Sequence, residues 1–598
     1  MVVIAKDLEL ERAIQDLPSE VQKEIRWFAR HIERLEAGEL DEDDFKRFRL
    51  ENGVYGIRGA PDMHMVRVKV RFGRITPHQL ETLAAIADQF TPHRRVHITT
   101  RQDIQFHHVR REDVPLVLAR IAQSGLTTRE ACGNTVRNVT ACPFAGVSPS
   151  EVFDVTPYAD AVSRYFLRHP ITQNLPRKFK IAFEGCREDH VVPAIHDIGA
   201  IAAVRRENGH LERGFRLYIA GGLGAQPRAA ELLEPFTPAD LLIPTCEAII
   251  RVFDRHGERR SDRLHRMRAR MKFLAKDWGI DRLREAILAE RRTLLLTRSG
   301  LMEDGIETVE EEPPDVDIPS LPPPDWEPSP EYEAWYRTNV RPQKQDGYFT
   351  VIIRCELGDI TSDGLRTVAR VARRWCAGRI RTAISQNLIL RWVPERALPW
   401  VYQELQSAGL AAAGAHSITD VTRCPGADTC QLALTHSRGL AEALDEVLAR
   451  DLADVSETPN LSIKISGCMN SCGQHHIADI GFYGASAEID GRPLPQYIVL
   501  VGGQPAGERV RFAKPVARVP ARRAPDVVRR LLALYRAQRQ PGESFAAFVD
   551  RVGTRPIKRA LEDLTSVPSF EEAPELYRDL GAEEETFRVE LGPGECSA

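Results

Sequence analysis

The 598-residue sequence lacks several features that would each assign it to a class at once. No apolar run reaches the roughly 18 residues of a membrane-spanning helix. The 81 Lys and Arg residues nearly balance the 85 Asp and Glu residues, so no overall charge attracts nucleic acid or a membrane. The first residues, MVVIAKDLELERAIQDL, contain acids and no long apolar stretch, unlike a secretory signal. We therefore expect a cytoplasmic protein with neither a membrane nor nucleic acid as its partner.

Cysteine is also scarce, with 11 residues in the whole chain, and these are clustered. So few cannot form the disulfide scaffold of a small secreted protein, and metal ligands or reduced thiols are better interpretations. Hydrophobic residues make up 43% and charged residues 28%, as in ordinary globular proteins. The length is roughly three to four times that of a typical domain, so more than one core is expected.

The chain contains one pattern twice. RVKVRFGRITPHQLETLAAIADQF in the first half resembles VIIRCELGDITSDGLRTVARVARRW in the second. Each predicts an alternating strand, a glycine turn and an amphipathic helix that begins after a threonine, Thr76 or Thr361. Two further strand-like segments, HITTRQDIQF and RTAISQNLIL, follow in the same order.

The register of the two copies continues beyond these segments. Cys142 and Cys186 are matched 282 positions later by Cys424 and Cys468, which coincidental periodicity does not explain. An internal duplication is therefore predicted, with a pocket between the two related halves. The fold class is α+β: two ferredoxin-like βαβ lobes and two larger mixed α/β lobes, related by a pseudo-two-fold repeat.

The predicted boundaries follow from this repeat and from a Pro- and acid-rich stretch that we interpret as an extended linker. The first copy comprises an N-terminal helical segment (residues 1–50), the first ferredoxin-like half-domain (51–130) and the first larger lobe (131–303). The linker (304–344) is followed by the second half-domain (345–415), the second larger lobe (416–555) and a peripheral acidic tail (556–598).

Four cysteines of the second copy have the spacing of a metal site. The sequence reads C-x5-C from Cys424 to Cys430 and C-x3-C from Cys468 to Cys472. Four thiolates suit zinc or an iron–sulfur cluster, and a C-x5-C pair is long for zinc, so the cluster is favoured without being settled. The glycines beside Cys468 allow the backbone to approach a cluster closely.

The motif C-x5-C…G-C-x-N-x-C-G resembles that of the sirohaem-containing sulfite and nitrite reductases, and the resemblance covers about residues 50–550. In that family the four cysteines hold a [4Fe–4S] cluster and the last also bridges to the sirohaem iron. The resemblance thus implies that Cys424, Cys430, Cys468 and Cys472 are cluster ligands and that Cys472 is the axial thiolate.

The remaining cysteines are predicted to be structural. Cys142 and Cys186 occupy first-half equivalents of two ligands, but position 148 is Ser and position 190 is His, so no second cluster is expected. They are interpreted as small buried residues, as are Cys246, Cys355 and Cys376. Cys132 is placed at the pocket rim in a packing role, and Cys596 in the tail as a free thiol.

Small anions such as sulfite and nitrite require cations that bind their oxygens and groups that donate protons. Four residues at positions that match the family are candidates: Arg67, Arg137, Lys178 and Lys180. In an extended RKFK segment both lysines project from one face. Relatives that reduce nitrite commonly carry Asn at the second position and those that reduce sulfite carry Lys, so Lys180 favours the dianion sulfite.

The resemblance also implies contacts to the carboxylates of sirohaem. TTRQDIQFHH matches a family strand and indicates Arg101, Gln105 and His107, with Gln386 as a candidate in the second copy and Asn470 in the cluster loop. The turn at Gly221 and Gly222 is interpreted as a close approach of backbone to the macrocycle, because it does not fit a dinucleotide fingerprint.

The predicted reaction is the six-electron reduction of sulfite to sulfide, with ferredoxin as the electron donor or, alternatively, a flavoprotein subunit. Reduction of nitrite to ammonia by the same cofactors is the alternative, and a related enzyme of corrinoid biosynthesis is less favoured. A rival from another class is a cysteine-ligated metalloprotein that binds nucleic acid through the basic run at residues 255–272. That run has three other interpretations: a solvated helix, contacts to sirohaem carboxylates through Arg270 and Lys272, or a docking face for an acidic electron carrier.

Overall fold

The structure is a computed structural model that describes residues 2–207, 209–260, 266–297, 310–320, 326–451, 461–506 and 509–592, together with positions 306, 308, 322 and 323. Cys596 and parts of the predicted linker lie outside the described residues. Within the described part of the chain, no helix is long and apolar enough to cross a membrane.

Helices form the N-terminal segment, as the sequence indicates. They are α1 (Val2–Ile14), α2 (Ser19–Glu36) and α3 (Glu42–Glu51). Helix α3 begins after Asp41, whose side chain accepts a hydrogen bond from the backbone N–H of Asp44. Phe28 and Phe45 from this segment are buried in the same core as the first half-domain, so the segment is part of that lobe.

Each ferredoxin-like half-domain contains a five-stranded sheet that borrows a strand from the other half. The first has the order β1-β2-β5-β4-β13 and the second β11-β12-β15-β14-β3. The strands are β1 (Val54–Ile57), β2 (Ala60–Val68), β3 (Arg74–Ile75), β4 (Arg95–Ile98), β5 (Ile104–Arg110), β11 (Val340–Pro342), β12 (Tyr348–Ile353), β13 (Asp359–Thr361), β14 (Ile380–Thr382) and β15 (Leu388–Pro394). The exchange of β3 and β13 joins the halves through backbone hydrogen bonds.

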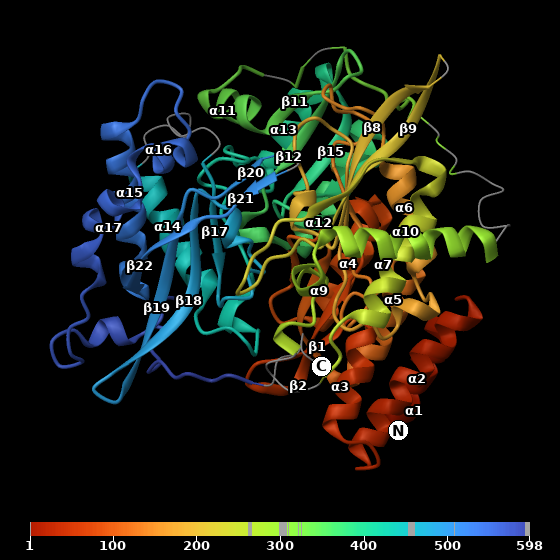
Figure 1. Ribbon diagram of the computed structural model, residues 1–598, viewed down its shortest axis with the longest axis horizontal. Coiled ribbons are helices and arrows are strands. Elements are labelled where there is room, and N and C mark those ends of the chain that lie inside the picture. Colours follow the sequence, from red (N-terminus) through yellow and green to blue (C-terminus); the bar gives the residue numbers. More distant parts are fainter. Residues whose placement is uncertain are drawn as a thin grey trace.

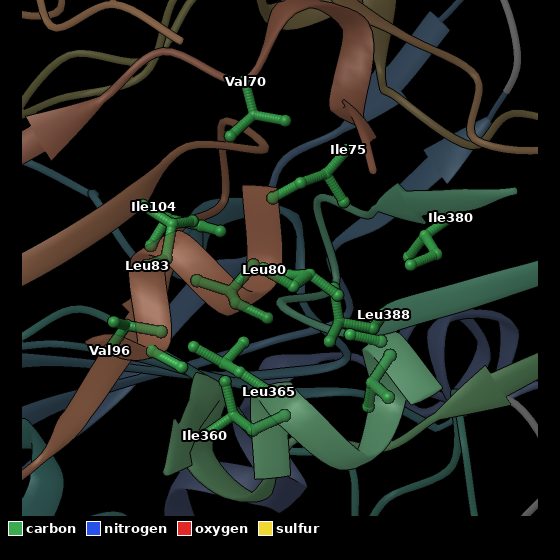
Figure 2. Packing of buried hydrophobic residues seen from close by; sticks show 14 of the residues in the cluster. Val70, Ile75, Leu80, Leu83, Val96, Ile104, Ile360, Leu365, Ile380 and Leu388 are labelled. Carbon is green, nitrogen blue, oxygen red and sulfur yellow. The ribbon is translucent and has the colours of Figure 1, made fainter. Parts of the chain in front are cut away.

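The helices of the half-domains begin where the sequence predicts. Thr76 caps α4 (Pro77–Phe90) in a capping box with Gln79, and Thr361 caps α12 (Ser362–Cys376). The other helices of these lobes are α5 (Val114–Gln123) and α13 (Leu398–Ser407). Figure 2 shows α4 and α12 contributing to one core, in which Leu80 of the first copy lies near Leu365 of the second and Ile75 lies beside its strand partner Ile380. The two copies therefore share a single hydrophobic core.

The two larger lobes also repeat each other. Their sheets have the orders β10-β9-β8-β7-β6 and β16-β17-β18-β19-β22, each with three parallel strands followed by two antiparallel ones. The first lobe contains β6 (Thr140–Ala141), α6 (Thr156–Phe166), β7 (Ile181–Glu184), β8 (Ile198–Glu207), β9 (His210–Ile219), β10 (Glu231–Pro238), α7 (Leu242–His256), α9 (Met271–Trp278) and α10 (Ile280–Thr297). Cys142, Cys186 and Cys246 are buried in its core.

The second larger lobe lies on the far side of the half-domains from the N-terminal helices (Figure 1, blue). It contains β16 (Thr422–Arg423), α14 (Ser437–Asp451), β17 (Ile463–Ser466), β18 (Ile480–Ile489), β19 (Arg492–Val501), β20 (Gln504–Ala506), β21 (Arg509–Arg511), β22 (Lys514–Pro520), α15 (Ala524–Gln538), α16 (Phe545–Val552) and α17 (Thr554–Ala560).

Two predicted segments are more structured than the sequence indicated. The region 304–344 includes α11 (Pro330–Asn339), which Ser329 caps and which buries Trp335, so its last part is not an extended linker. The tail is not wholly peripheral, because Asp579 is buried and accepts hydrogen bonds from both the backbone N–H and the ring Nδ1 of His436. Leu576 and Tyr577 of the tail are also buried and pack against Leu494 of β19, so the acidic composition concealed both apolar and polar contacts.

Candidate functional site

The four cysteines of the spacing motif follow the ends of two neighbouring parallel strands. Cys424 comes directly after β16, and Cys468 comes shortly after β17. Burial raises the pKa of Cys468 well above its usual value, and the charges of Cys472, Cys430 and Cys424 raise it further, so Cys468 lies within the field of the other three. The backbone N–H of Gly467 donates to the Sγ atom of Cys424 at 3.2 Å. A soft four-sulfur donor set is thus present, with backbone N–H groups directed at sulfur.

The small size of Gly467 is required by packing. A Cβ atom there would lie 2.7 Å from the carbonyl oxygen of Thr435 and 2.9 Å from the Cβ atom of Ala433. Asn470 lies exposed in the turn between Cys468 and Cys472. The exposure of the cysteines increases along the motif, from buried Cys424 to exposed Cys472.

The predicted arginines Arg67 and Arg137 meet. Arg67 lies on β2 and Arg137 precedes β6. The Nη1 atoms of both donate to the hydroxyl oxygen of Tyr55, at 3.2 and 3.4 Å, and to the carbonyl oxygen of Ala131, at 3.3 and 3.1 Å. Cys132 is buried beside Tyr55 in a small apolar cluster. Two guanidinium groups are therefore held side by side by acceptors that they share. Tyr55, which provides one of these acceptors, belongs to no motif that the sequence reveals.

An acidic residue that the sequence analysis missed lies among these cations. Asp103 is buried, and Arg67, Arg101 and Lys69 are among the cations whose charges act on it. Burial nevertheless dominates and raises the pKa of Asp103 to about 6. Its Oδ1 atom has no hydrogen-bond partner in the described part of the chain. Asp103 lies within TTRQDIQFHH, so the motif itself contained the signal.

Of the two predicted lysines, Lys180 is influenced by the charges of both the arginines and Cys472. Lys178 and Lys180 flank fully buried Phe179 and are themselves partly exposed, as expected for an extended segment. Burial lowers the pKa of Lys180 well below its usual value, and Arg101, Arg270 and Lys178 lower it further. The charge of Cys472 acts in the opposite direction, so this lysine lies within the field of the last cysteine. The hydroxyl of Thr100 also donates to the carbonyl oxygen of Cys472 at 2.9 Å.

Asp197 joins the segment with Lys180 to Arg270. It accepts a hydrogen bond from the backbone N–H of Lys180 at 2.9 Å and pairs with Arg270 at 2.9 Å. The repeat could have revealed it, because Asp479 lies 282 positions later and accepts in the same way from the backbone N–H of Ser462. Neighbouring His196 contacts the guanidinium of Arg101.

The glycine turn after β9 is explained by protein packing. A Cβ atom on Gly221 would lie 2.5 Å from the carbonyl oxygen of Ala194, and one on Gly222 would lie 2.8 Å from Nη2 of Arg270. Lys272 donates to the carbonyl oxygen of Leu223 at 2.8 Å, and its pKa is lowered to about 7 by burial. The predicted approach to the macrocycle stays a prediction, since backbone atoms of the protein already require glycine at position 221.

The remaining predicted contacts separate into two groups. Gln105 and His107 are neighbours on one side of β5, with 3.3 Å between the Gln105 amide and Nε2 of His107. The amide of Gln105 also faces Arg67, whose Nη2 lies 2.6 Å from its oxygen in the favoured orientation. His107 borders a cavity of about 290 Å³, which Pro425 and Thr429, in the loop between Cys424 and Cys430, also line.

The side-chain amide of Gln386 forms hydrogen bonds within the protein. It is buried, its amide donates to the carbonyl oxygen of Ile98 at 2.8 Å, and its oxygen accepts from the backbone N–H of Arg423 at 2.9 Å. Gln102 makes the equivalent contacts in the first half, to Thr382 and Ala141. These contacts indicate that Gln386 positions the start of the cluster loop.

The basic run at residues 255–272 divides in two, apart from residues 261–265, which lie outside the described residues. On the surface, Arg255 pairs with Glu290 at 2.7 Å and Arg268 with Asp277 at 2.9 Å. Arg270 and Lys272 are buried, and Arg270 pairs with Asp197. Their contact to sirohaem carboxylates stays a prediction. Ion pairing of the outer arginines gives no support to a nucleic-acid surface.

Comparison with protein families matches residues 132–293 and 414–568 to the nitrite and sulphite reductase 4Fe-4S domain. It matches residues 56–124 and 341–408 to the nitrite/sulfite reductase ferredoxin-like half domain. The chain belongs to the nitrite and sulphite reductase family. The matches coincide with the two half-domains and the two larger lobes of the structure, so the predicted duplication is confirmed.

Individual relatives carry both substrate names. The chain is 28% identical to the assimilatory ferredoxin-dependent nitrite reductase of Haloferax mediterranei, over 95% of this chain and 96% of that protein. It is 30% identical to sulfite reductase [ferredoxin] 2 of Mycolicibacterium paratuberculosis, over 81% and 82%. The structure of the Mycobacterium tuberculosis NirA protein matches with a TM-score of 0.73 and 27% identity, covering 87% of this chain and 92% of that one.

Members of this family are oxidoreductases that use sirohaem and a [4Fe–4S] cluster. The residues present fit both groups. The donor set of four cysteines suits an iron–sulfur cluster. In the described part of the chain, the buried Nε atoms of Arg101, Arg270 and Arg423 have no hydrogen-bond partner, which suits the carboxylates of an acidic macrocycle.

Proposed function

We propose that this enzyme reduces sulfite to sulfide in a six-electron reaction, with ferredoxin as the donor. The single observation that carries the proposal is the convergence of Arg67 and Arg137 on shared acceptors, with Lys180 in the field of Cys472. Such an arrangement favours a small, doubly charged oxyanion beside the cysteine motif.

The proposed assignments follow the motif. Cys424, Cys430, Cys468 and Cys472 hold the cluster, and Arg101, His107 and Asn470 contact the sirohaem. When bound, these groups supply the electrons and the iron site for the substrate. Side chains of this protein bind the anion and donate the protons.

Arg67 and Arg137 bind the oxygens of the anion with guanidinium groups whose orientation is fixed before the substrate arrives. The Nζ atoms of Lys178 and Lys180 donate protons to oxygens that leave as water. A lowered pKa at Lys180 makes this donation easier, because its neutral form is less costly in the buried site. Charge accumulates on oxygen during reduction, so a fixed set of cations stabilises the transition state more than the bound anion.

The substrate is tested by Lys180→Asn. Loss of one cation weakens binding of a dianion more than that of a monoanion, so the ratio of kcat/KM for sulfite to that for nitrite should fall at least about tenfold. Exposed Lys276 on α9 provides the matched control, and Lys276→Asn should leave the ratio unchanged. Both anions are assayed with one reduced ferredoxin, and an unchanged ratio in Lys180→Asn contradicts the assignment.

Nitrite reduction to ammonia is the second candidate. It is supported by the relative from Haloferax mediterranei, which is named a nitrite reductase and matches 95% of this chain. A wild-type kcat/KM for nitrite that exceeds the value for sulfite would establish it. Ferredoxin as the donor is supported by relatives of both names that are called ferredoxin-dependent or [ferredoxin]. Turnover with a reduced flavoprotein but not with ferredoxin would contradict that part.

A further inference from the structure

A second cluster of metal-binding side chains lies in the first larger lobe, away from the four-cysteine motif. It consists of Cys142, Glu184, Cys186 and His190, whose ligand atoms all lie within 4.8 Å of one another. Cys142 comes directly after β6, and Glu184 ends the neighbouring parallel strand β7. Three of the four residues are buried and His190 is nearly so. From the sequence alone these cysteines are interpreted as packing residues, because the first half lacks the other two cysteines of a four-cysteine cluster.

The internal repeat places this group where the other half has its cysteine motif. Cys142 and Cys186 match Cys424 and Cys468 at 282 positions, and His190 precedes Cys472 by the same interval. The fourth position, 148, is Ser. Glu184 reaches the group from the end of β7 and supplies a fourth donor. The duplicated site has therefore kept three ligand-type residues and replaced the fourth.

Three of the distances between ligand atoms are close to those of a tetrahedral metal site, and all the others are within 4.8 Å. The two Sγ atoms are 3.6 Å apart, and Nδ1 of His190 lies 3.3 Å from Sγ of Cys142 and 3.6 Å from Oε1 of Glu184. Zinc–sulfur bonds of about 2.3 Å and zinc–nitrogen bonds of about 2.0 Å at tetrahedral angles separate two sulfurs by about 3.8 Å, and sulfur from nitrogen by about 3.5 Å. No large movement is needed to close these ligands around one ion.

The surrounding groups hold the ligands in place. Oε1 and Oε2 of Glu184 accept hydrogen bonds from the backbone N–H groups of Cys186, at 3.0 Å, and His190, at 2.7 Å. The second ring nitrogen of His190, Nε2, lies 3.5 Å from a carboxylate oxygen of Glu188. A histidine that binds metal through one nitrogen commonly donates from the other to a carboxylate. A cavity of about 170 Å³ beside Glu184, Cys186 and Glu188 provides a path for the ion.

We propose that these four residues bind one zinc ion, which links the ends of β6 and β7 in the half of the molecule that lacks the cysteine motif. Binding displaces the two thiol protons to solvent and leaves two thiolates, one carboxylate and a neutral imidazole around Zn²⁺. No electron is transferred. Two sulfurs, one nitrogen and one oxygen favour zinc over magnesium or calcium, which require oxygen ligands.

The test is metal analysis of the purified holoenzyme together with X-ray absorption at the zinc edge. The expected result is one zinc per chain beyond the about five irons of cluster and sirohaem, with two sulfur neighbours at about 2.3 Å and two nitrogen or oxygen neighbours at about 2.0 Å. Zinc-free protein, zinc without sulfur neighbours, or a Cys142–Cys186 disulfide found by mass spectrometry overturns the proposal. The wild-type measurement needs no variant to fold.

Variants then assign the ligands. Cys186→Ala and His190→Ala should lower zinc to below about a tenth of the wild-type content while iron and sirohaem absorbance are retained. Cys246→Ala is the matched control, because Cys246 is a buried cysteine of the same lobe and lies outside the metal-binding group. Zinc that persists in both ligand variants contradicts the site. Since zinc and iron are counted separately, this outcome does not depend on whether the proposed sulfite reduction is correct.

Discussion

At the scale of single residues, the candidate site is defined by which charges share a buried region. Arg67 and Arg137 carry the same charge and still lie together, because Tyr55 and Ala131 offer oxygen acceptors to both. Asp103 adds a carboxyl group to this region. The candidate site thus contains an acid and a phenol as well as the cations.

Asp103 gives a prediction about pH. Its pKa is about 6 in the folded protein and near 3.8 when unperturbed, so the folded state binds more protons between these values. Stability conferred by this residue therefore falls as pH rises through that window, by an amount on the order of 3 kcal/mol in total. Asp103→Asn removes the effect, so its stability relative to wild type should rise by about 1 kcal/mol between about pH 5 and pH 7.5.

The measurement is chemical unfolding of wild type and variant at both pH values. Asp62→Asn in the same half-domain is the control, since Asp62 is 83% exposed. A stability difference that does not change with pH, or that changes in the opposite sense, is incompatible with a raised pKa at Asp103.

The sequence predicted several individual residues and missed others for physical reasons. Arg67, Arg137, Lys178 and Lys180 could be named because anion chemistry requires cations and a motif located them. Tyr55 could not, because a phenol that orients two guanidinium groups has no characteristic spacing. The role of Glu184 beside Cys186 has no characteristic spacing either. Glu184 is the last residue of strand β7, and from the sequence it reads as part of that strand.

At the scale of elements, short strand β13 connects three parts of the molecule. Asp359 at its start pairs with His97 of β4 at 2.8 Å and with Arg423 at 3.0 Å, and it also contacts Arg438 of α14. These cations hold the pKa of Asp359 far below its usual value despite burial. One carboxylate therefore joins the first sheet to the start of the cluster loop.

Asp359→Asn should destabilise the protein by about 3–5 kcal/mol at neutral pH, because it leaves buried cations without their partner. The folded-state pKa lies below the unfolded one, so the stabilisation is present above about pH 4 and is lost as pH falls further. The difference between wild type and variant in denaturant unfolding should accordingly shrink on acidification. Asp363→Asn is the control on neighbouring α12, where the side chain is 84% exposed, and an equal loss in both variants refutes the assignment.

The sequence predicted the strand–helix order of each copy but not the exchange of β3 and β13. Hydrophobic alternation shows that a segment is a strand, and it contains no information on which sheet a two- or three-residue strand completes. The tail was misjudged for a similar reason. Its composition is acidic, and only the fold shows that Asp579 meets His436.

At the scale of the whole molecule, the duplication has produced one folding unit. β13 pairs with β4, and β3 pairs with β14, so each half-domain lacks a strand without the other. Leu80 and Leu365 belong to one buried cluster (Figure 2). Separation of the halves would expose this apolar surface on both, and typical domains are stable by only about 5–15 kcal/mol.

The two halves should therefore fold only together. We expect fragments 1–306 and 307–598, expressed separately, to be insoluble or unfolded, because each exposes an unpaired sheet edge and half of the shared core. Co-expression should restore a soluble complex with the cluster and sirohaem absorbance of the intact chain, since the cut lies between the lobes and outside every described helix and strand. Circular dichroism of each fragment and visible absorbance of the complex provide the measurements. A cooperatively folded fragment 1–306 would mean that β13 and the second copy of the core are dispensable, and that the halves associate as independent domains.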